Sequence, residues 1–267
     1  MSMSYQEIQL ERDARGVATL WLNRPDKNNA FNAAVIRELN AALAEVQADP
    51  AIRFLVLRGR GKHFSAGADL AWMQQSAKLD YAANQADAHE LGELMHRLYH
   101  LPQPTLAVVR GAAFGGALGL IACCDMAIGA SDALFCLSEV RIGLAPAVIS
   151  PFVVKAIGER ATRRYALTAE RFTGARAREL GLLAEHYPAS ELDAALEQWV
   201  ANLLLNSPQA LKATKHLLVE VGPGQLDDQL REFTEQVIAT LRTSPEGQEG
   251  LNAFLEKRTP AWQESRS

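Results

Sequence analysis

The stretch VIRELNAALAEVQADPAIRFLVL, residues 35–57, contains the two patterns that decide the fold. In its first part, apolar residues recur at the spacing of an amphipathic helix, and they are Val35, Ile36, Leu39, Ala42, Leu43 and Val46. Asp49-Pro50 ends that helix, and the continuous apolar run Phe54-Leu55-Val56-Leu57 then predicts a buried strand. A helix that leads directly into a buried strand is typical of α/β proteins.

The same alternation continues on both sides of this stretch. Upstream, Glu7 to Leu10 and Val17 to Leu22 are strand-like runs joined by a turn-rich segment, which predicts a hairpin. Downstream, a polar loop of residues 58–67 precedes a mostly helical stretch that ends at His100, and the strand Thr105 to Val109 follows. This repetition predicts an α/β domain whose ligand site lies where strands end and loops begin.

The strand signal fades beyond about Ser150, and helical patterns continue to the end of the chain. Ser207-Pro208 and Ser244-Pro245 each supply an N-cap residue followed by proline at the first helical position. We therefore expect an α/β core in residues 1–190 and a helical region in residues 191–267. The helical region should pack on this core or on a neighbouring subunit.

Composition excludes several classes of protein. The chain has 267 residues, is 48% hydrophobic and 22% charged, and carries a formal net charge of -4. These values are typical of a soluble globular protein and disfavour non-specific binding to nucleic acid. The longest low-charge stretch, residues 111–128, is broken by glycines and an aspartate, so we expect no membrane span.

Two further features indicate the compartment. The N-terminal segment MSMSYQEIQLERD carries acids where a signal sequence would be apolar, so we expect no export. Cys123, Cys124 and Cys136 lie in apolar surroundings and lack Cys-x-x-Cys spacing, which favours core thiols in a reducing compartment. We therefore expect a cytoplasmic location.

Two small-residue segments could bind a ligand through the backbone. Phe64 to Leu70 and Gly111 to Gly119 each follow a predicted strand and lead into a predicted helix. Small side chains leave backbone N–H groups open, and glycines at the head of a helix add the positive end of its dipole, which suits an oxyanion. A plain turn explains the first segment equally, and close packing of a helix on a sheet explains the second.

Glu139 is an isolated acid after an apolar predicted strand. Apolar surroundings disfavour a charged carboxylate, which raises its pKa towards the range for accepting and donating protons. A salt bridge to Arg141 is the alternative explanation, although a strand neighbour should point to the opposite face. Two amide-rich turns and one acid are together the parts needed to stabilise a thioester enolate and move a proton.

With these features the sequence resembles the enoyl-CoA hydratase/isomerase, or crotonase, family. The resemblance extends from Asn23 to about Trp262. The segments that carry it are residues 23–32, residues 65–70, residues 111–119 with Cys124-Asp125, residues 138–144 and residues 253–258. It implies a crotonase-like spiral core of repeated ββα units that binds the CoA thioester. The helical C-terminal part would serve oligomerisation, as a homotrimer or a dimer of trimers, and cover the active site.

The resemblance also implies roles for individual residues. The backbone N–H groups of Ala68 and Gly116 would form the oxyanion hole, and Glu139 would be the acid/base. Coenzyme A would bind through residues of two loops and the C-terminus, and these are Lys27, Asn28, Ala66, Asp69, Leu70, Ala71, Phe254 and Lys257. Phe254 and Lys257 match positions that often come from another subunit. The lysines Lys27 and Lys257 are alternatively solvated surface residues.

No metal or separate cofactor is implied, because coenzyme A is part of the substrate. His89, His96 and His100 lie on a mostly amphipathic helical stretch without a third ligand in view, which favours surface or core histidines over a metal site. The expected partner is an acyl-CoA substrate, with neither nucleic acid nor a membrane.

Gly119 departs from the pattern of the hydratases, which usually carry a second glutamate there. A backbone carbonyl, a hydroxyl or a second water would then complete the orientation of the attacking water. Residues 143–154, together with residues 69–73 and 116–120, look like those of bacterial hydratases for branched glutaconyl-type thioesters, 3-methylglutaconyl-CoA or isohexenylglutaconyl-CoA, in leucine and acyclic-terpene breakdown. This favours a hydratase. An isomerase that uses the lone Glu139 and a non-catalytic acyl-CoA-binding relative remain the alternatives.

Overall fold

The computed structural model describes residues 5–222 and 224–263, so residues 1–4 of the N-terminal segment discussed above lie outside the description. The elements in chain order are β1 (Ile8–Arg12), β2 (Val17–Leu22), η1 (Pro25–Lys27), α1 (Ala33–Ala48), β3 (Phe54–Gly59), α2 (Leu70–Ser76), α3 (Tyr81–Tyr99), β4 (Thr105–Val109), β5 (Ala112–Phe114), α4 (Gly116–Cys123), β6 (Met126–Ala130), β7 (Leu134–Cys136), η2 (Glu139–Ile142), α5 (Ser150–Ile157), α6 (Glu159–Thr168), β8 (Phe172–Thr173), α7 (Gly174–Glu179), β9 (Glu185–Tyr187), α8 (Leu192–Leu204), α9 (Pro208–Val221), α10 (Asp228–Thr243), α11 (Pro245–Glu256) and η3 (Ala261–Gln263).

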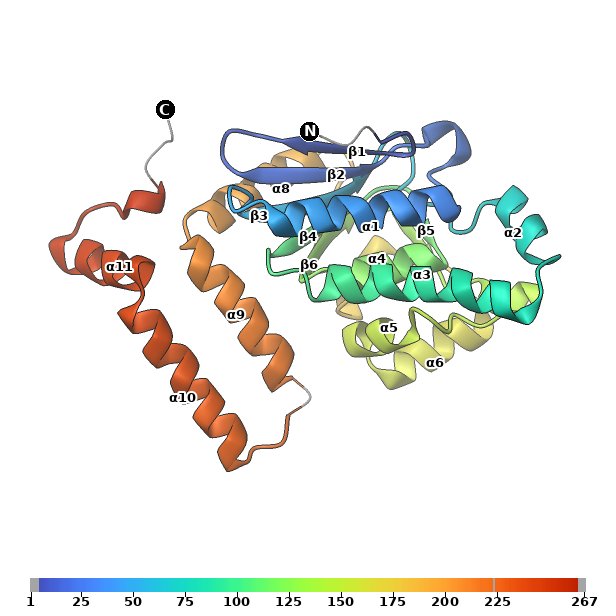
Figure 1. Cartoon of the computed structure of the whole chain (residues 1–267). Coiled ribbons are helices and arrows are strands. Elements are labelled where there is room, and N and C mark those ends of the chain that lie inside the picture. The colour runs from blue at the N-terminus through green and yellow to red at the C-terminus, as the bar shows by residue number, and fades with distance from the viewer. Residues whose placement is uncertain (1–4, 223, 264–267) are drawn as a thin grey trace.

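The strands form two separate sheets. The larger has the order β1-β2-β3-β4-β6-β9, in which β1 and β2 form the expected antiparallel hairpin and the remaining pairs are parallel. The smaller has the order β5-β7-β8. From β4 to β7 successive strands alternate between the sheets, because β4 and β6 belong to the larger one and β5 and β7 to the smaller one. This winding confirms the expected spiral of ββα units with a helical C-terminal part (Figure 1).

The helix predicted from the apolar positions between Val35 and Val46 forms as α1. The side chain of Asn32 caps α1 by accepting a hydrogen bond from the Val35 amide. The buried residues of α1 are the same apolar positions whose spacing predicted the helix. They pack with the strands of the larger sheet in one hydrophobic core, which includes the fully buried Leu20, Leu39 and Phe54.

Two short strands were not expected. β8 and β9 lie beyond residue 150, where the sequence predicted helices alone. They span two and three residues, which is too short for an alternating pattern to be visible in the sequence.

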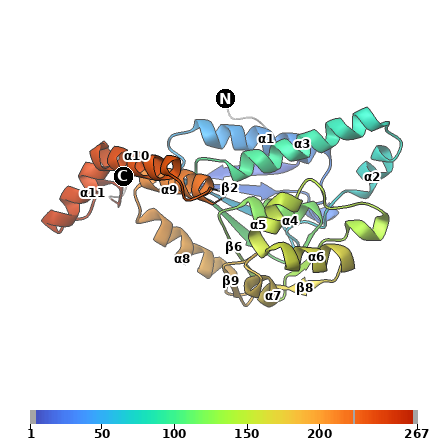
Figure 2. The ribbon, with the colours of Figure 1, turned by 90° about the horizontal axis from the view of Figure 1, so that it is seen from below.

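The helices that extend away from the α/β core begin later in the chain than residue 191, the start expected for the helical region. α8 packs against β6 and β9 and buries Leu192, Leu196 and Val200 in the common core. By contrast, α9, α10 and α11 extend away from the α/β part, on the side opposite α2 (Figures 1 and 2). No described residue in α10 is buried. Among the described residues, no helix is both long enough and apolar enough to cross a membrane.

One ion pair fastens this C-terminal part to the core. Lys215 is the buried residue of α9. Its Nζ lies 2.8 Å from Asp125 Oδ2 and donates to the Gln103 carbonyl oxygen at 3.2 Å. Asp125 Oδ2 also accepts hydrogen bonds from the Thr105 amide and hydroxyl. A polar contact therefore anchors α9 where most helices of this fold use apolar side chains.

Candidate active site

Pairing of two chain segments brings the predicted amide turns together. The segment after β3 runs beside β5, where the Ser65 amide donates to the Ala112 carbonyl oxygen and the Phe114 amide to the Ser65 carbonyl oxygen, both at 3.0 Å. A Cβ built at Gly67 would lie 3.0 Å from the Phe114 carbonyl oxygen. Ala68 therefore follows a closely packed contact between the two segments.

Gly115 shapes the second turn. Its φ of 55° and ψ of -126° define a backbone conformation that is open essentially only to glycine. Its amide donates to the Cys136 carbonyl oxygen at 2.9 Å, which fixes the turn to β7. The chain then enters α4, whose first residue is Gly116. The first amides of a helix have no partner within it, so the Gly116 N–H is available to a ligand.

Phe31 links the segments that carry the Ala68 and Gly116 amides, a role that was not predicted from the sequence. Its amide donates to the Gly67 carbonyl oxygen at 2.7 Å, and its carbonyl oxygen accepts from the Asp69 amide at 2.8 Å. Its ring would lie 3.2 Å from a Cβ at Gly116. Within residues 5–222 and 224–263, nothing accepts a hydrogen bond from the amides of Ala68 or Gly116. Each of these two amides is therefore free to donate a hydrogen bond.

The carboxyl group of Glu139 lies against the same turn. A Cβ built at Gly115 would lie 3.3 Å from Glu139 Oε1. Oε2 is buried and has no hydrogen-bond partner in the described structure. Burial raises the pKa of Glu139 above its ordinary value of 4.5. A carboxyl with one unpartnered oxygen and a raised pKa, beside a helix N-terminus, is suited to accept and release a proton.

The alternative salt bridge is absent from the described residues. Arg141 Nη2 donates instead to the Ala169 carbonyl oxygen at 2.8 Å. Glu139 and Arg141 both lie in the 3-10 helix η2, after β7 has ended. The expectation that Arg141 points to the opposite face of a strand was therefore wrong in its premise. Its guanidinium is held away from the carboxyl group by the contact with Ala169.

Several residues expected to bind coenzyme A meet in one place. Lys27, Asp69 and Ala71 line a common cavity of about 340 Å³. The Asn28 carbonyl oxygen accepts a hydrogen bond from the Ala66 amide at 2.9 Å, which holds their two loops together. Next to them, the side chain of Leu70 is 77% exposed at the start of α2.

Asp69 has a structural role that the sequence did not reveal. Its Oδ1 accepts hydrogen bonds from the Ala71 and Trp72 amides at the start of α2, and its Oδ2 lies 3.0 Å from Arg24 Nη1. Burial alone would raise the pKa of Asp69, but the two amides and Arg24 together lower it below its ordinary value. The Asp69 carboxylate and the Ala71 amide therefore already have partners within the chain.

Phe254 and Lys257 lie elsewhere. Phe254 is 82% exposed on α11, and Lys257 ends that helix with a φ of 56°. α11 stands on the side of the molecule opposite α2 (Figure 1). One chain therefore does not bring these two residues to the other predicted site residues.

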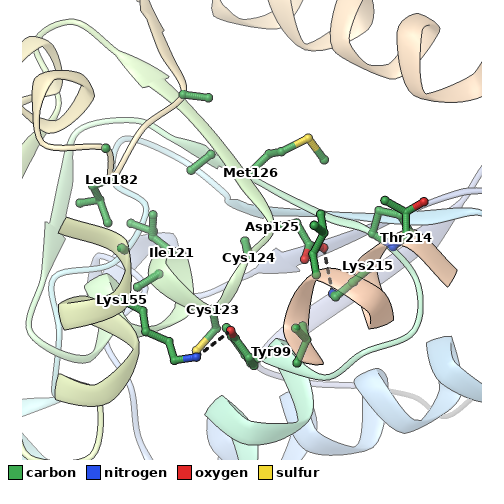
Figure 3. A pocket seen from close by; sticks show the side chains of 18 of the residues that line it. Tyr99, Ile121, Cys123, Cys124, Asp125, Met126, Lys155, Leu182, Thr214 and Lys215 are labelled. Carbon is green, nitrogen blue, oxygen red and sulfur yellow. Dashed lines mark hydrogen bonds and ion pairs between the residues drawn. The ribbon is translucent and has the colours of Figure 1, made fainter. Parts of the chain in front are cut away.

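A separate cavity of about 590 Å³ lies at the far end of α4 and is lined by Cys123 and Cys124 (Figure 3). Lys155 Nζ and the Tyr99 hydroxyl, 3.4 Å apart, lie at its edge. Burial, followed by the charge of Asp125, raises the pKa of Cys124 to about 12, so its thiol is a poor nucleophile. No residue predicted for the site lines this cavity. Within the described chain, no group of three His, Cys, Asp or Glu side chains could hold a metal ion.

The fold and the paired amides beside an acid define a class of protein. Residues 12–265 match the sequence model of the family described as Enoyl-CoA hydratase/isomerase. The chain belongs to this family, whose members act on CoA thioesters.

Similar proteins support this assignment. The crystal structure of an enoyl-CoA hydratase from Shewanella pealeana is 48% identical, covers 96% of each chain and has a TM-score of 0.92. The structure of Pseudomonas aeruginosa AtuE is 39% identical, covers 97% of this chain and 100% of that one, and has a TM-score of 0.93. The 2,3-dehydroadipyl-CoA hydratase of Escherichia coli is 32% identical over 256 residues, which are 95% of this chain and 97% of that protein.

Proposed function

We propose that the chain is a hydro-lyase that adds water across the α,β double bond of an enoyl-CoA thioester. The observation that carries this proposal is the Glu139 carboxyl, whose buried Oε2 has no hydrogen-bond partner, beside the turn that opens α4, where the Gly116 amide is free. The free amide of Ala68 provides the second donor. Coenzyme A enters as part of the substrate, and the reaction uses no separate cofactor.

The two amides act on the thioester oxygen. As the water oxygen bonds to the β carbon, the electron pair of the double bond moves towards the carbonyl and places negative charge on its oxygen. Ala68 and Gly116 donate hydrogen bonds to that oxygen, and the dipole of α4 adds to their effect. Because the donors are fixed by the Phe31 contacts, they need no rearrangement when the charge develops.

Glu139 moves the proton. Its carboxylate accepts a proton from the water as the oxygen–carbon bond forms, and the resulting carboxylic acid delivers that proton to the α carbon of the enolate. Both new bonds form on the face of the substrate that Glu139 occupies, so the addition is syn. The carboxylate is regenerated at the end, and a raised pKa helps it to perform both steps.

For the substrate, we propose a branched glutaconyl-type thioester, 3-methylglutaconyl-CoA or isohexenylglutaconyl-CoA, in leucine or acyclic-terpene breakdown. The support is the resemblance of residues 143–154, 69–73 and 116–120 to the bacterial hydratases for these thioesters. We also propose a cytoplasmic homotrimer or dimer of trimers. In such an assembly, the distant Phe254 and Lys257 can cover the site of a neighbouring subunit.

Isomerisation is the second candidate, and Gly119 favours it because a single acid suffices to shuttle a proton between two carbons of an enoyl-CoA. The test is a product assay on 2-enoyl and 3-enoyl CoA esters, each with and without a 3-methyl branch and a distal carboxylate. A 3-hydroxyacyl product supports hydration, whereas interconversion of the two esters without it supports isomerisation. A chain that binds the esters but yields no product from any of them is the non-catalytic relative.

A further inference from the structure

Gly119 sits in a space that admits no side chain. A Cβ built at Gly119 would lie 2.8 Å from Ile149 Cβ, closer still to Ile149 Cγ2, and 3.1 Å from Met95 Cε. Real Cβ atoms hardly ever approach other atoms this closely. Ile149 is only 2% exposed and Met95 is fully buried, so neither can swing aside into solvent. The space beside Gly119 is therefore filled by hydrocarbon.

Ile149 packs on α4 close to the turn that meets the Glu139 carboxyl. Gly115 is the N-cap residue of α4, with a non-helical backbone conformation, and Gly119 lies four residues further along the chain. A Cβ built at Gly115 would lie 3.3 Å from Glu139 Oε1, whereas a Cβ built at Gly119 would meet Ile149. Position 119 therefore lies about one helical turn beyond the turn that meets this carboxyl, and it is the position at which the hydratases that the sequence resembles usually carry a second glutamate.

We propose that Ile149, backed by Met95, is the residue that limits this site to a single proton-handling carboxyl. The proposal rests on the function proposed for Glu139. Ile149 acts through packing: it excludes a side chain at position 119, so no acid at that position can hold the attacking water. The orientation of that water then depends on Glu139 and on groups other than a side chain at position 119.

Thermal stability tests the packing without reference to activity. We compare Gly119→Ala in the wild-type chain and in an Ile149→Ala chain. The added methyl group should lower the Tm by about 5 °C in the wild type, because it overpacks a filled core. In the Ile149→Ala chain it should lower the Tm by far less, because the obstructing side chain is gone.

Gly92→Ala on α3 is the matched control. A Cβ at Gly92 would lie 4.0 Å from its nearest neighbour, Val148 Cγ1, so this variant should retain the wild-type Tm or exceed it. An equal loss from Gly119→Ala in both backgrounds would overturn the proposal, since it would mean that Ile149 is not the obstruction.

A second experiment asks whether the space accepts an acid. Gly119→Glu/Ile149→Ala should fold and show a second carboxyl ionisation in the pH profile of kcat/KM for hydration. The matched variant Gly119→Gln/Ile149→Ala should lack it. Identical profiles in the two variants would contradict the proposal. If Glu139 were not the acid, Glu139→Gln would retain turnover and the stability comparison would be unchanged, so the two failures are distinguishable.

Discussion

At the scale of a single residue, the burial of the Glu139 carboxyl costs folding stability and favours its role in proton transfer. A buried carboxyl oxygen without a hydrogen-bond partner is costly, and most such groups in folded proteins find one. The other oxygen, Oε1, lies against Gly115 in the turn that carries the Gly116 donor. The cost is what raises the pKa of Glu139 and keeps its proton transferable.

We expect Glu139→Gln to abolish hydration while binding of the CoA thioester persists, because the amide keeps the shape of the side chain but cannot accept a proton from water. Turnover by product assay and affinity by calorimetry check this. Hydration at the wild-type rate would remove Glu139 from the mechanism.

The same variant should also be more stable than the wild type at neutral pH. The folded chain binds the Glu139 proton more tightly than the unfolded chain, so stability falls as the pH rises through the raised pKa. Gln has no such penalty. The Tm difference between variant and wild type should therefore be larger at neutral pH than below pH 4.5, the ordinary value of this carboxyl. A difference independent of pH would contradict the raised pKa of Glu139.

The Gly116 amide can be removed almost alone. Gly116 is the first residue of α4, a position at which proline fits because no helical hydrogen bond is lost. We expect Gly116→Pro to lower kcat by about 10²–10³-fold, the usual effect of losing one oxyanion donor.

Gly116→Ala is the control, because it adds the same contact with the Phe31 ring but keeps the N–H. Circular dichroism and Tm establish that both variants fold. Equal losses of kcat in the two would show that crowding, and not the donor, is responsible.

The candidate site residues differ in how well they could be predicted from the sequence. Glu139 and the glycine turns could be predicted because their residue types are unusual in apolar runs. Phe31 and Ile149 could not, since each looks like any other core residue, and only packing between distant segments gives them a role. The ion pair between Asp69 and Arg24 was missed for a related reason, because Arg24 lies in another loop.

At the scale of elements, α9 depends on one polar contact. We expect Lys215→Met to lower the free energy of unfolding by about 2 kcal/mol, because Asp125 loses its ion-pair partner. The value lies below that for fully buried pairs because the Asp125 side chain is 28% exposed. Urea denaturation measures it.

Lys212→Met on the same helix is the control, since Lys212 is more exposed than Lys215. Adding Asp125→Asn to Lys215→Met should restore part of the loss, because the uncompensated charge is removed. If the single variant unfolds like the wild type, the ion pair does not anchor α9.

The elements themselves were predictable in proportion to their length. α1 has a repeating apolar stripe over 16 residues, and β3 is a continuous apolar run that is buried on both faces. η2 is four residues long, so the segment around Glu139 looked like the end of a strand. The position of α8 in the core could not be predicted, because an apolar stripe indicates that a helix packs against something but does not identify its packing partner.

At the scale of the whole molecule, α10 and α11 expose apolar side chains, among them Ile238, Leu251, Phe254 and Leu255. Exposed apolar side chains on two successive helices are compatible with the subunit contacts proposed above. If Phe254 completes the site of a neighbouring subunit, Phe254→Ala should raise KM for the CoA thioester about tenfold. Leu255→Ala, which changes the adjacent exposed residue, should leave KM near the wild-type value.

Mixing subunits decides whether the site is shared. Glu139→Gln and Phe254→Ala chains are denatured and refolded together, and activity is measured at low substrate concentration. Under this condition each variant alone should have little activity, and the mixture should recover part of the wild-type activity. Recovery comes from sites that combine an intact Glu139 with an intact Phe254 from another chain. Activity no higher than the average of the separate variants would place Phe254 outside the neighbour's site.

The fit of Ile149 against Gly119 also restricts how this lineage can evolve. A mutation that first introduces an acid at position 119 meets a filled core and is lost before selection can act on its chemistry. Shrinking Ile149 first leaves a void that itself costs about 2–5 kcal/mol for a change to alanine. Acquiring an acid at position 119 therefore takes two substitutions, and either order passes through a destabilised intermediate.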